Sequence, residues 1–126
     1  MRLLPRQDRR YLEGRGIPAR EVTEGGKKGV ILTGITLPEG KYQVAQADIL
    51  ILLPPAYPDV APDMFYAVPH LTLVTSQCEP RCTQVRETHA GQTWQRWSRH
   101  NNQWRPGTDG IWTMLKRVEE ALEVAA

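Results

Sequence analysis

The segment that most constrains the fold is a run of five apolar residues, Ile49 to Leu53, that ends at Pro54 and Pro55. Side chains of a strand point alternately to the two faces of a sheet, so this run predicts a strand that is buried on both faces. We expect helices to cover the sheet. The run is far shorter than the roughly 20 residues that a membrane helix needs, so the sequence predicts no membrane span.

Hydrophobic periodicity elsewhere predicts helices at the two ends of an α+β domain. A short opening helix is expected within residues 3–16, where apolar residues at helical spacing are followed by Gly14 and Gly16. A closing amphipathic helix is expected to start at Thr108 or Asp109, either of which can cap it. Its apolar face is formed by Ile111, Leu115, Val118 and Leu122.

Apolar and β-branched residues predict four strands between these helices, at about 30–37, 42–53, 64–68 and 71–74. The connections are too short for parallel crossovers, so we expect a four-stranded antiparallel meander from about Val30 to Val74, flanked by an N-terminal and a C-terminal helix. Residues 76–107 show no sustained periodicity. A long irregular segment is uncommon in a compact domain unless it is functional, so we expect the site there.

Composition limits the classes of partner. The 126 residues match one domain, 1–126, and their net charge of +2 is too small to favour nucleic acid. Two cysteines are too few to staple a chain of this length, and the charged N-terminus lacks the apolar core of a signal peptide. We therefore expect a cytoplasmic protein with reduced thiols.

Two ordered motifs resemble those of the ubiquitin-conjugating enzymes. The predicted strand is followed by Tyr57-Pro58 and, a few residues later, by Pro62, while Trp104-Arg105-Pro106-Gly107 leads into the closing helix. Together with the segment from Trp94 to His100, they resemble most closely the prokaryotic group labelled family E. The resemblance implies the fold of these enzymes, structural roles for Tyr57, Pro58, Pro62, Trp104 and Pro106, and no cofactor. It also implies a ubiquitin-like protein and an activating enzyme as partners.

The sequence departs from this family at the residues that carry the chemistry. The usual His-Pro-Asn tripeptide is missing, and Pro69-His70-Leu71 is the nearest substitute. The position of the expected thiol falls at or close to Trp94. Since tryptophan cannot carry a thioester, the usual thioester relay at that position is excluded.

Three interpretations of the site remain. In the first, Ser98 accepts the C-terminus of the ubiquitin-like protein as an oxyester. His100 is then the base, on the same side as Ser98 if the backbone is extended, and Arg96 and Arg99 stabilise the oxyanion or hold an acidic partner. In the second, Cys78 or Cys82 is the carrier thiol, and Arg81 favours the thiolate.

The third interpretation is a zinc site formed by Cys78, Cys82 and His89 with His70 or His100. Thiolate and imidazole suit zinc, but only the spacing of Cys78 and Cys82 resembles that of a structural zinc site, so the sequence predicts no metal. If no residue of the chain forms a covalent bond to the ubiquitin-like protein, the domain is a docking adaptor.

Two groups of residues are candidates for partner binding. The basic residues of the opening helix, Arg2, Arg6, Arg9 and Arg10, would steer an acidic activating enzyme. Trp94 and Trp97 would contact a partner protein. Interleaved tryptophan and arginine residues can also stack the bases of single-stranded nucleic acid, which is the alternative from another functional class.

Overall fold

The computed structural model describes residues 4–100 and 103–126. Six strands form one sheet in the order β1-β2-β3-β4-β6-β5, and all neighbouring strands are antiparallel. None of the helices within these two ranges is long and apolar enough to cross a membrane. In chain order the elements are α1 (Arg6–Gly14), β1 (Ala19–Glu24), β2 (Lys27–Thr36), β3 (Gln46–Leu53), β4 (Phe65–Val68), β5 (Arg86–His89), β6 (Gln92–Trp97) and α2 (Ile111–Val124).

The α+β class is confirmed, but the predicted limits of the sheet are wrong at both ends. The first four strands form an antiparallel meander from Ala19 to Val68, whereas the prediction placed it between Val30 and Val74. β1 was not predicted because its sequence shows no apolar alternation. Its side chains are exposed or half-buried. Residues 71–74 do not form a strand: Leu73 makes only an isolated bridge to Tyr42.

A hairpin of β5 and β6 occupies part of the segment that was predicted to be irregular. Its two-residue turn, Ala90-Gly91, has φ values of 51° and 75°. Positive φ at both positions is typical of the tight turns that connect antiparallel strands. β6 then pairs with β4 and extends the sheet. The prediction missed this hairpin because all four residues of β5 are polar.

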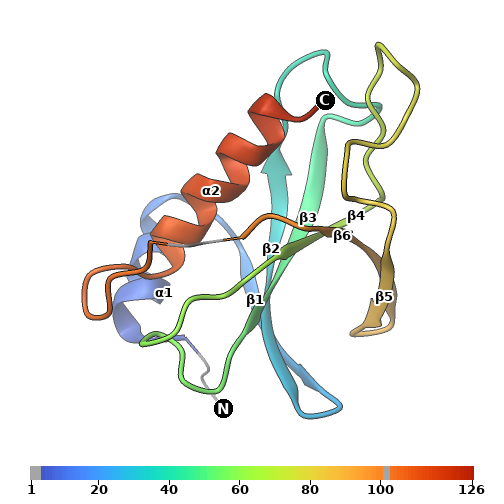
Figure 1. The fold of residues 1–126 in the computed structure, drawn as a ribbon. Coiled ribbons are helices and arrows are strands. Elements are labelled where there is room, and N and C mark those ends of the chain that lie inside the picture. Colours follow the sequence, from blue (N-terminus) through green and yellow to red (C-terminus); the bar gives the residue numbers. More distant parts are fainter. Residues whose placement is uncertain (1–3, 101–102) are drawn as a thin grey trace.

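The sheet is buried on both faces, as Ile49 to Leu53 predicted, but helices cover only one of them. α1 and α2 lie on the same side of the sheet (Figure 1) and pack there against residues such as Ile49, Ile51 and Trp97. On the other face, a smaller cluster of Ile31, Leu50, Tyr66 and Trp94 is buried. The sheet curls around this cluster, and the Ala90 N–H donates to Glu24 Oε2 at 2.9 Å.

Asp8 of α1 caps the N-terminus of α2, where Thr108 or Asp109 was expected. Its Oδ1 accepts from the Ile111 N–H at 3.2 Å. A side chain at Gly110 would collide with this carboxylate, since a Cβ there would lie 2.5 Å from Asp8 Oδ1. Asp8 Oδ2 accepts a short hydrogen bond from the Tyr57 hydroxyl. One buried carboxylate therefore connects α1, α2 and the Tyr57-Pro58 turn.

We predict that the protein loses stability at alkaline pH. Burial raises the pKa of Tyr42 and of Tyr66 to about 12 from the ordinary value of 10. Burial and the hydrogen bond to Asp8 raise the pKa of Tyr57 in the same direction. The folded state therefore holds these protons more tightly than the unfolded state. Their contribution is complete below about pH 10 and is lost as the pH rises through the folded-state values.

Urea unfolding between pH 8 and pH 11 measures this effect. Replacing Tyr57 by Phe removes one of the titrating groups, so the decline above pH 10 should become shallower by up to about 1.4 kcal/mol per pH unit. An identical decline in Tyr57→Phe and the unmodified protein would contradict the prediction.

Candidate functional site

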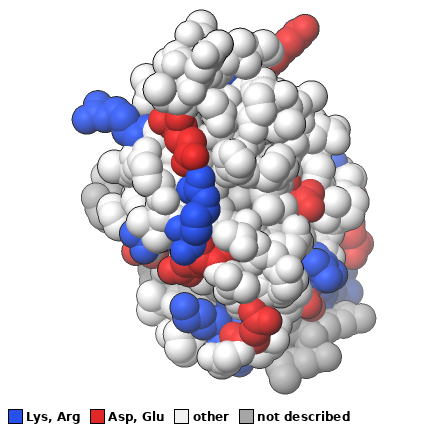
Figure 2. All heavy atoms as spheres, turned by 90° about the vertical axis from the view of Figure 1, so that its right-hand side faces the viewer, with Lys and Arg blue, Asp and Glu red and all other residues white. Residues whose placement is uncertain are grey.

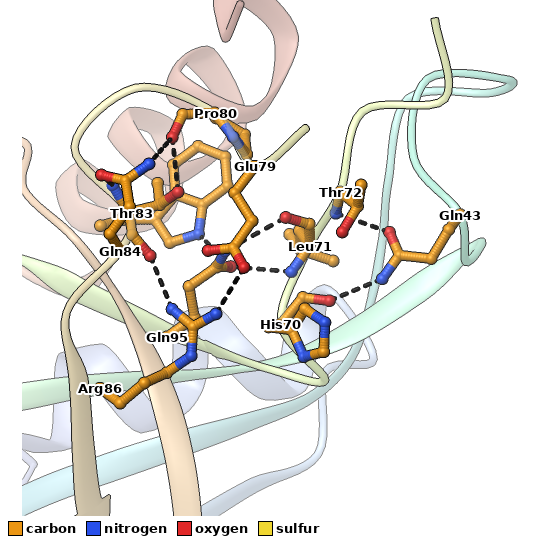
Figure 3. A network of polar contacts seen from close by, with 11 residues as sticks. Gln43, His70, Leu71, Thr72, Glu79, Pro80, Thr83, Gln84, Arg86 and Gln95 are labelled. Atoms are coloured by element: carbon orange, nitrogen blue, oxygen red, sulfur yellow. Dashed lines mark hydrogen bonds and ion pairs between the residues drawn. The ribbon is translucent and has the colours of Figure 1, made fainter. Parts of the chain in front are cut away.

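A buried amide holds the chain that follows β4 against β6. Gln95 of β6 is fully buried. Its Oε1 accepts from the Leu71 N–H at 2.8 Å and from Trp97 Nε1 at 2.9 Å. Its Nε2 donates to the Leu71 carbonyl at 3.1 Å and to Glu79 Oε1 at 3.2 Å. Figure 3 shows Gln95 at the centre of these contacts. All the hydrogen-bonding capacity of the amide is thus used.

Glu79 extends this network to the surface. Its Oε2 accepts from Arg86 Nη2 at 2.6 Å, and Arg86 Nη1 donates to the Thr83 carbonyl at 2.8 Å. Burial alone would raise the pKa of Glu79, but the hydrogen bonds from Arg86 and Gln95 outweigh it and hold that pKa below its usual value. The carboxylate therefore stays ionised. The network fixes residues 71–83 beside the hairpin of β5 and β6.

The end of this fixed segment lies against the predicted nucleophile. The Ser98 N–H donates to the Cys82 carbonyl at 3.1 Å, so both candidate nucleophiles belong to one place in the fold. Cys82 is exposed and has a positive φ of 59°. Cys78 is also exposed. Ser98 itself is half-buried.

The predicted geometry between Ser98 and His100 needs correction. The Arg99 N–H donates to the Trp97 carbonyl at 3.0 Å, so the chain turns at Ser98 and is not extended there. His100 Nδ1 lies 2.8 Å from Asp63 Oδ1. Within residues 4–100 and 103–126, no hydrogen bond joins the Ser98 hydroxyl to His100. Asp63, which the sequence analysis missed, is thus the observed partner of this histidine.

His100 and Asp63 stand at a cavity of about 290 Å³ that we call the histidine cavity. Arg99 also lines it, together with Arg117 and Glu120 of α2. Its apolar wall is formed by Phe65, Met114, Ala121 and Val124. Arg96 is not among the lining residues. It lies opposite Tyr66 in the pairing of β4 with β6.

The guanidinium of Arg99 is held from two sides. It lies over the Trp97 ring, 4.9 Å from the centroid, and its Nη1 is 3.2 Å from the carbonyls of Arg81 and Ser98. These partners are neutral, and Arg99 forms no ion pair with the described residues, although Asp63 and Glu120 line the same cavity. The structure therefore brings together Arg99, His100 and Asp63 at the histidine cavity. Ser98 precedes Arg99 in the chain but is not among the residues that line this cavity.

The Tyr57-Pro58 turn and the segment that begins at Trp104 lie against each other. Trp104 Nε1 donates to the Pro58 carbonyl at 2.8 Å, and the rings of Tyr57 and Trp104 are 6.2 Å apart. Pro62 is buried, whereas Pro106 is exposed in the turn that precedes α2. Asp109 closes this turn, since its Oδ2 accepts from the Arg105 N–H at 2.8 Å.

Trp94 and Trp97 do not form a partner-binding surface. Both side chains are fully buried, and Trp97 stacks on Phe65 with ring centroids 5.2 Å apart. Trp94 Nε1 donates to the His89 carbonyl at 2.8 Å. Neither ring can contact a partner protein or stack a base unless the core opens. Figure 2 shows acidic and basic side chains interspersed on the face seen there, a pattern that does not favour nucleic acid.

The zinc hypothesis also lacks support. The described part of the chain contains no group of three or more His, Cys, Asp or Glu side chains that could hold a metal ion. His89 is buried at the end of β5, whereas Cys78 and Cys82 are exposed.

The basic residues of the opening helix are only partly available. Arg6 and Arg10 are exposed and lie one turn apart on α1. Arg9 is half-buried and its Nη1 donates to the Leu4 carbonyl at 2.5 Å. Arg2 lies outside the described residues.

The combination of fold and motifs defines a class. Ubiquitin-conjugating-like domains share three features with this chain. These are a meander of antiparallel strands flanked by helices, a Tyr-Pro turn between two strands (here β3 and β4), and a Trp-x-Pro element before a helix (here α2). The model of the prokaryotic E2 family E matches residues 4–125, and the chain belongs to this family. Comparison with curated proteins and with solved structures gave no significant match. Family membership associates the chain with ubiquitin-like conjugation, and in general with ubiquitin-like proteins and activating enzymes.

We predict that Gln95→Leu destabilises the protein by about 3 kcal/mol or more. Leucine fills a similar volume but leaves the N–H and the carbonyl of Leu71 and the Trp97 Nε1–H without a partner, at about 1–3 kcal/mol each. Urea unfolding measures the difference. Gln92→Leu, at the half-buried start of the same strand, is the matched control and should change stability by less than about 1 kcal/mol. Equal effects at the two positions would contradict the structural role of Gln95.

Proposed function

We propose that this protein accepts a ubiquitin-like protein as an oxyester on Ser98 and passes it to an acceptor. The proposal rests on the pair of His100 and Asp63, whose Nδ1 and Oδ1 atoms lie 2.8 Å apart. His100 follows Ser98, the residue with the hydroxyl, by two positions in the chain. When Nδ1–H donates to Asp63, Nε2 presents its lone pair and can act as a base. A base that is oriented by a carboxylate is the usual means of activating a serine.

The proposed reaction is an acyl transfer. Ser98 Oγ attacks the carbonyl carbon of the activated C-terminus that the activating enzyme carries, and His100 Nε2 takes the hydroxyl proton. A new C–O bond forms, the bond to the activating enzyme breaks, and the leaving group takes the proton from the imidazolium. The guanidinium of Arg99 stabilises the developing oxyanion. Because the chain turns at Ser98, the reaction requires a rearrangement or a bridging water that brings Ser98 Oγ within reach of His100 Nε2, and contacts of this kind can form only in the reacting complex.

A second candidate acceptor is Cys82. It is favoured by the hydrogen bond between the Ser98 N–H and the Cys82 carbonyl at 3.1 Å, which brings an exposed thiol residue to the same place. The chemistry would be the same, with a thioester in place of the oxyester. A docking adaptor is the remaining alternative, and it predicts no covalent adduct at all.

We predict that incubation with the activating enzyme, the ubiquitin-like protein and ATP yields a hydroxide-labile adduct. Ser98→Ala should eliminate it, and Ser98→Cys should convert it to a thiol-labile adduct. His100→Ala should slow its formation by roughly a hundredfold, the usual scale for the loss of a general base, and Asp63→Asn should slow it less. Intact-protein mass spectrometry over time measures the yield.

Cys82→Ser, with Cys78→Ser as its matched control, tests the alternative thiol. Both variants should form the adduct at the unmodified rate. If Ser98→Ala forms the adduct normally and Cys82→Ser does not, the acceptor is Cys82 and the oxyester proposal fails.

We further propose that the exposed side of α1 docks the activating enzyme. Arg6 and Arg10 can steer an acidic partner, and Arg9 supports the helix through its bond to the Leu4 carbonyl. The double variant Arg6→Glu, Arg10→Glu should lower the association rate at least about tenfold at low salt, and high salt should reduce this difference. Stopped-flow fluorescence measures the rate. Lys27→Glu, Lys28→Glu on β2 makes the same change of charge elsewhere, and an equal loss there would contradict a specific surface on α1.

A further inference from the structure

One carboxylate joins two corners of the sheet that are far apart in the strand order. β1 and β5 are the two edge strands, and four strands lie between them. Glu24 at the end of β1 nevertheless reaches the turn of the β5–β6 hairpin. Its Oε2 accepts from the Ala90 N–H at 2.9 Å and lies 3.8 Å from His89 Nδ1. Within residues 4–100 and 103–126, no lysine or arginine forms an ion pair with Glu24, so its carboxylate is directed to this turn.

The two joined corners cover the apolar side chains on the face of the sheet that carries no helix. We call these buried side chains the second cluster: Ile31, Leu50, Tyr66 and Trp94. Val22 of β1 and Ala90 of the hairpin turn pack against them. Both helices lie on the other side of the sheet (Figure 1). The second cluster is therefore kept from water by the curl of the sheet, and whatever holds the curl closed also holds the cluster closed.

Trp94 connects the hairpin turn to the second cluster. Its side chain is fully buried, and its Nε1 donates to the carbonyl of His89, the residue before Ala90. Movement of the turn would therefore remove the partner of this indole. Trp97 on the same strand belongs to the helix-covered core, where its Nε1 donates to Gln95 Oε1. The two buried indole N–H groups thus report separately on the two faces of the sheet.

The closed arrangement at this corner is only weakly favoured. The Glu24 side chain is 50% exposed, and polar contacts that water reaches contribute less than buried ones. His89 Nε2 is buried and has no hydrogen-bond partner among the described residues. This unsatisfied nitrogen opposes closure, because water would hydrate it if the hairpin opened. We therefore expect this corner to open locally before the helix-covered face does.

We infer that Glu24 is a latch: its contact with the turn of the β5–β6 hairpin keeps the second cluster closed, and its release opens the cluster to solvent while the helix-covered core stays folded. Leu52 and Tyr66, at the edge of the cluster, also line a cavity of about 670 Å³, so opening would join the cluster to existing surface. The latch is a property of the fold and does not depend on the proposed transfer reaction.

Hydrogen exchange of the two indole N–H groups, followed by NMR of the ¹⁵N-labelled protein, tests the latch. Glu24 does not touch the Trp94 indole, so exchange there reports on opening and not on the lost hydrogen bond itself. In Glu24→Ala, the Trp94 indole should exchange at least about tenfold faster, the change expected when a hydrogen bond to a charged group no longer opposes opening. The Trp97 indole should exchange at its former rate. Unchanged exchange at Trp94, or equal acceleration at Trp94 and Trp97, would overturn the inference.

Two further variants identify the contact. Glu24→Gln keeps the length of the side chain and an acceptor oxygen for the Ala90 N–H, so it should restore part of the protection of Trp94. Glu39→Ala removes an exposed carboxylate from the turn between β2 and β3 and is the matched control, in which Trp94 should stay protected. No restoration in Glu24→Gln, or faster exchange of Trp94 in Glu39→Ala, would contradict the assignment. Thermal unfolding verifies that the variants are folded.

The dye ANS measures whether opening exposes the second cluster. ANS fluoresces when it binds exposed apolar surface. Its fluorescence should be stronger with Glu24→Ala than with the unmodified protein or with Glu39→Ala. Equal fluorescence of the three proteins would contradict exposure of the cluster, even if the Trp94 indole exchanged faster.

Discussion

The architecture around the candidate site depends on the buried amide of Gln95. It is fully buried, and it contacts Leu71 twice, Trp97 once and Glu79 once. A buried amide that lacked one of these partners would destabilise the fold. We therefore expect the four contacts to form together, and the segment after β4 to lose its anchor if they do not form. The same segment continues to the Cys82 carbonyl, which accepts from the Ser98 N–H, so the amide supports residues 98–100 indirectly, together with the pairing of β6 and β4. The chemistry of the site is therefore supported by a residue that does not line it.

A second buried polar group organises the other end of the molecule. Asp8 accepts from Ile111 at the start of α2 and from the hydroxyl of Tyr57, so α1, α2 and the Tyr-Pro turn meet at one carboxylate. α2 in turn supplies Arg117 and Glu120 to the histidine cavity. Asp8 therefore helps to position the start of α2, while the apolar face of this helix packs in the core and directs its other residues toward the cavity.

The sequence predicted those parts of the fold that depend on local apolar patterns. The run from Ile49 to Leu53, the apolar face of α2 and the opening helix were recognised because their spacing is regular. The hairpin of β5 and β6 was missed because the residues of β5 are polar and show no apolar alternation. The role of Gln95 was missed because its partners Leu71 and Glu79 lie 24 and 16 positions away. For the same reason the partner of His100 was not foreseen, since Asp63 is 37 positions distant. Trp94 and Trp97 were misinterpreted because an aromatic residue in a polar segment can equally belong to a surface or to the core, and only tertiary packing decides.

The central claim is that the hydroxyl of Ser98 carries the ubiquitin-like protein. Trypsin cleaves after arginine, so it releases Ser98 in the peptide 97–99 and Cys82 in the peptide 82–86. Tandem mass spectrometry of the unmodified protein, digested at mildly acidic pH after incubation with the activating enzyme, the ubiquitin-like protein and ATP, locates the adduct on one of them. The account predicts that the C-terminal residues of the ubiquitin-like protein remain attached to peptide 97–99. Attachment to peptide 82–86, or an adduct on neither peptide, would contradict it.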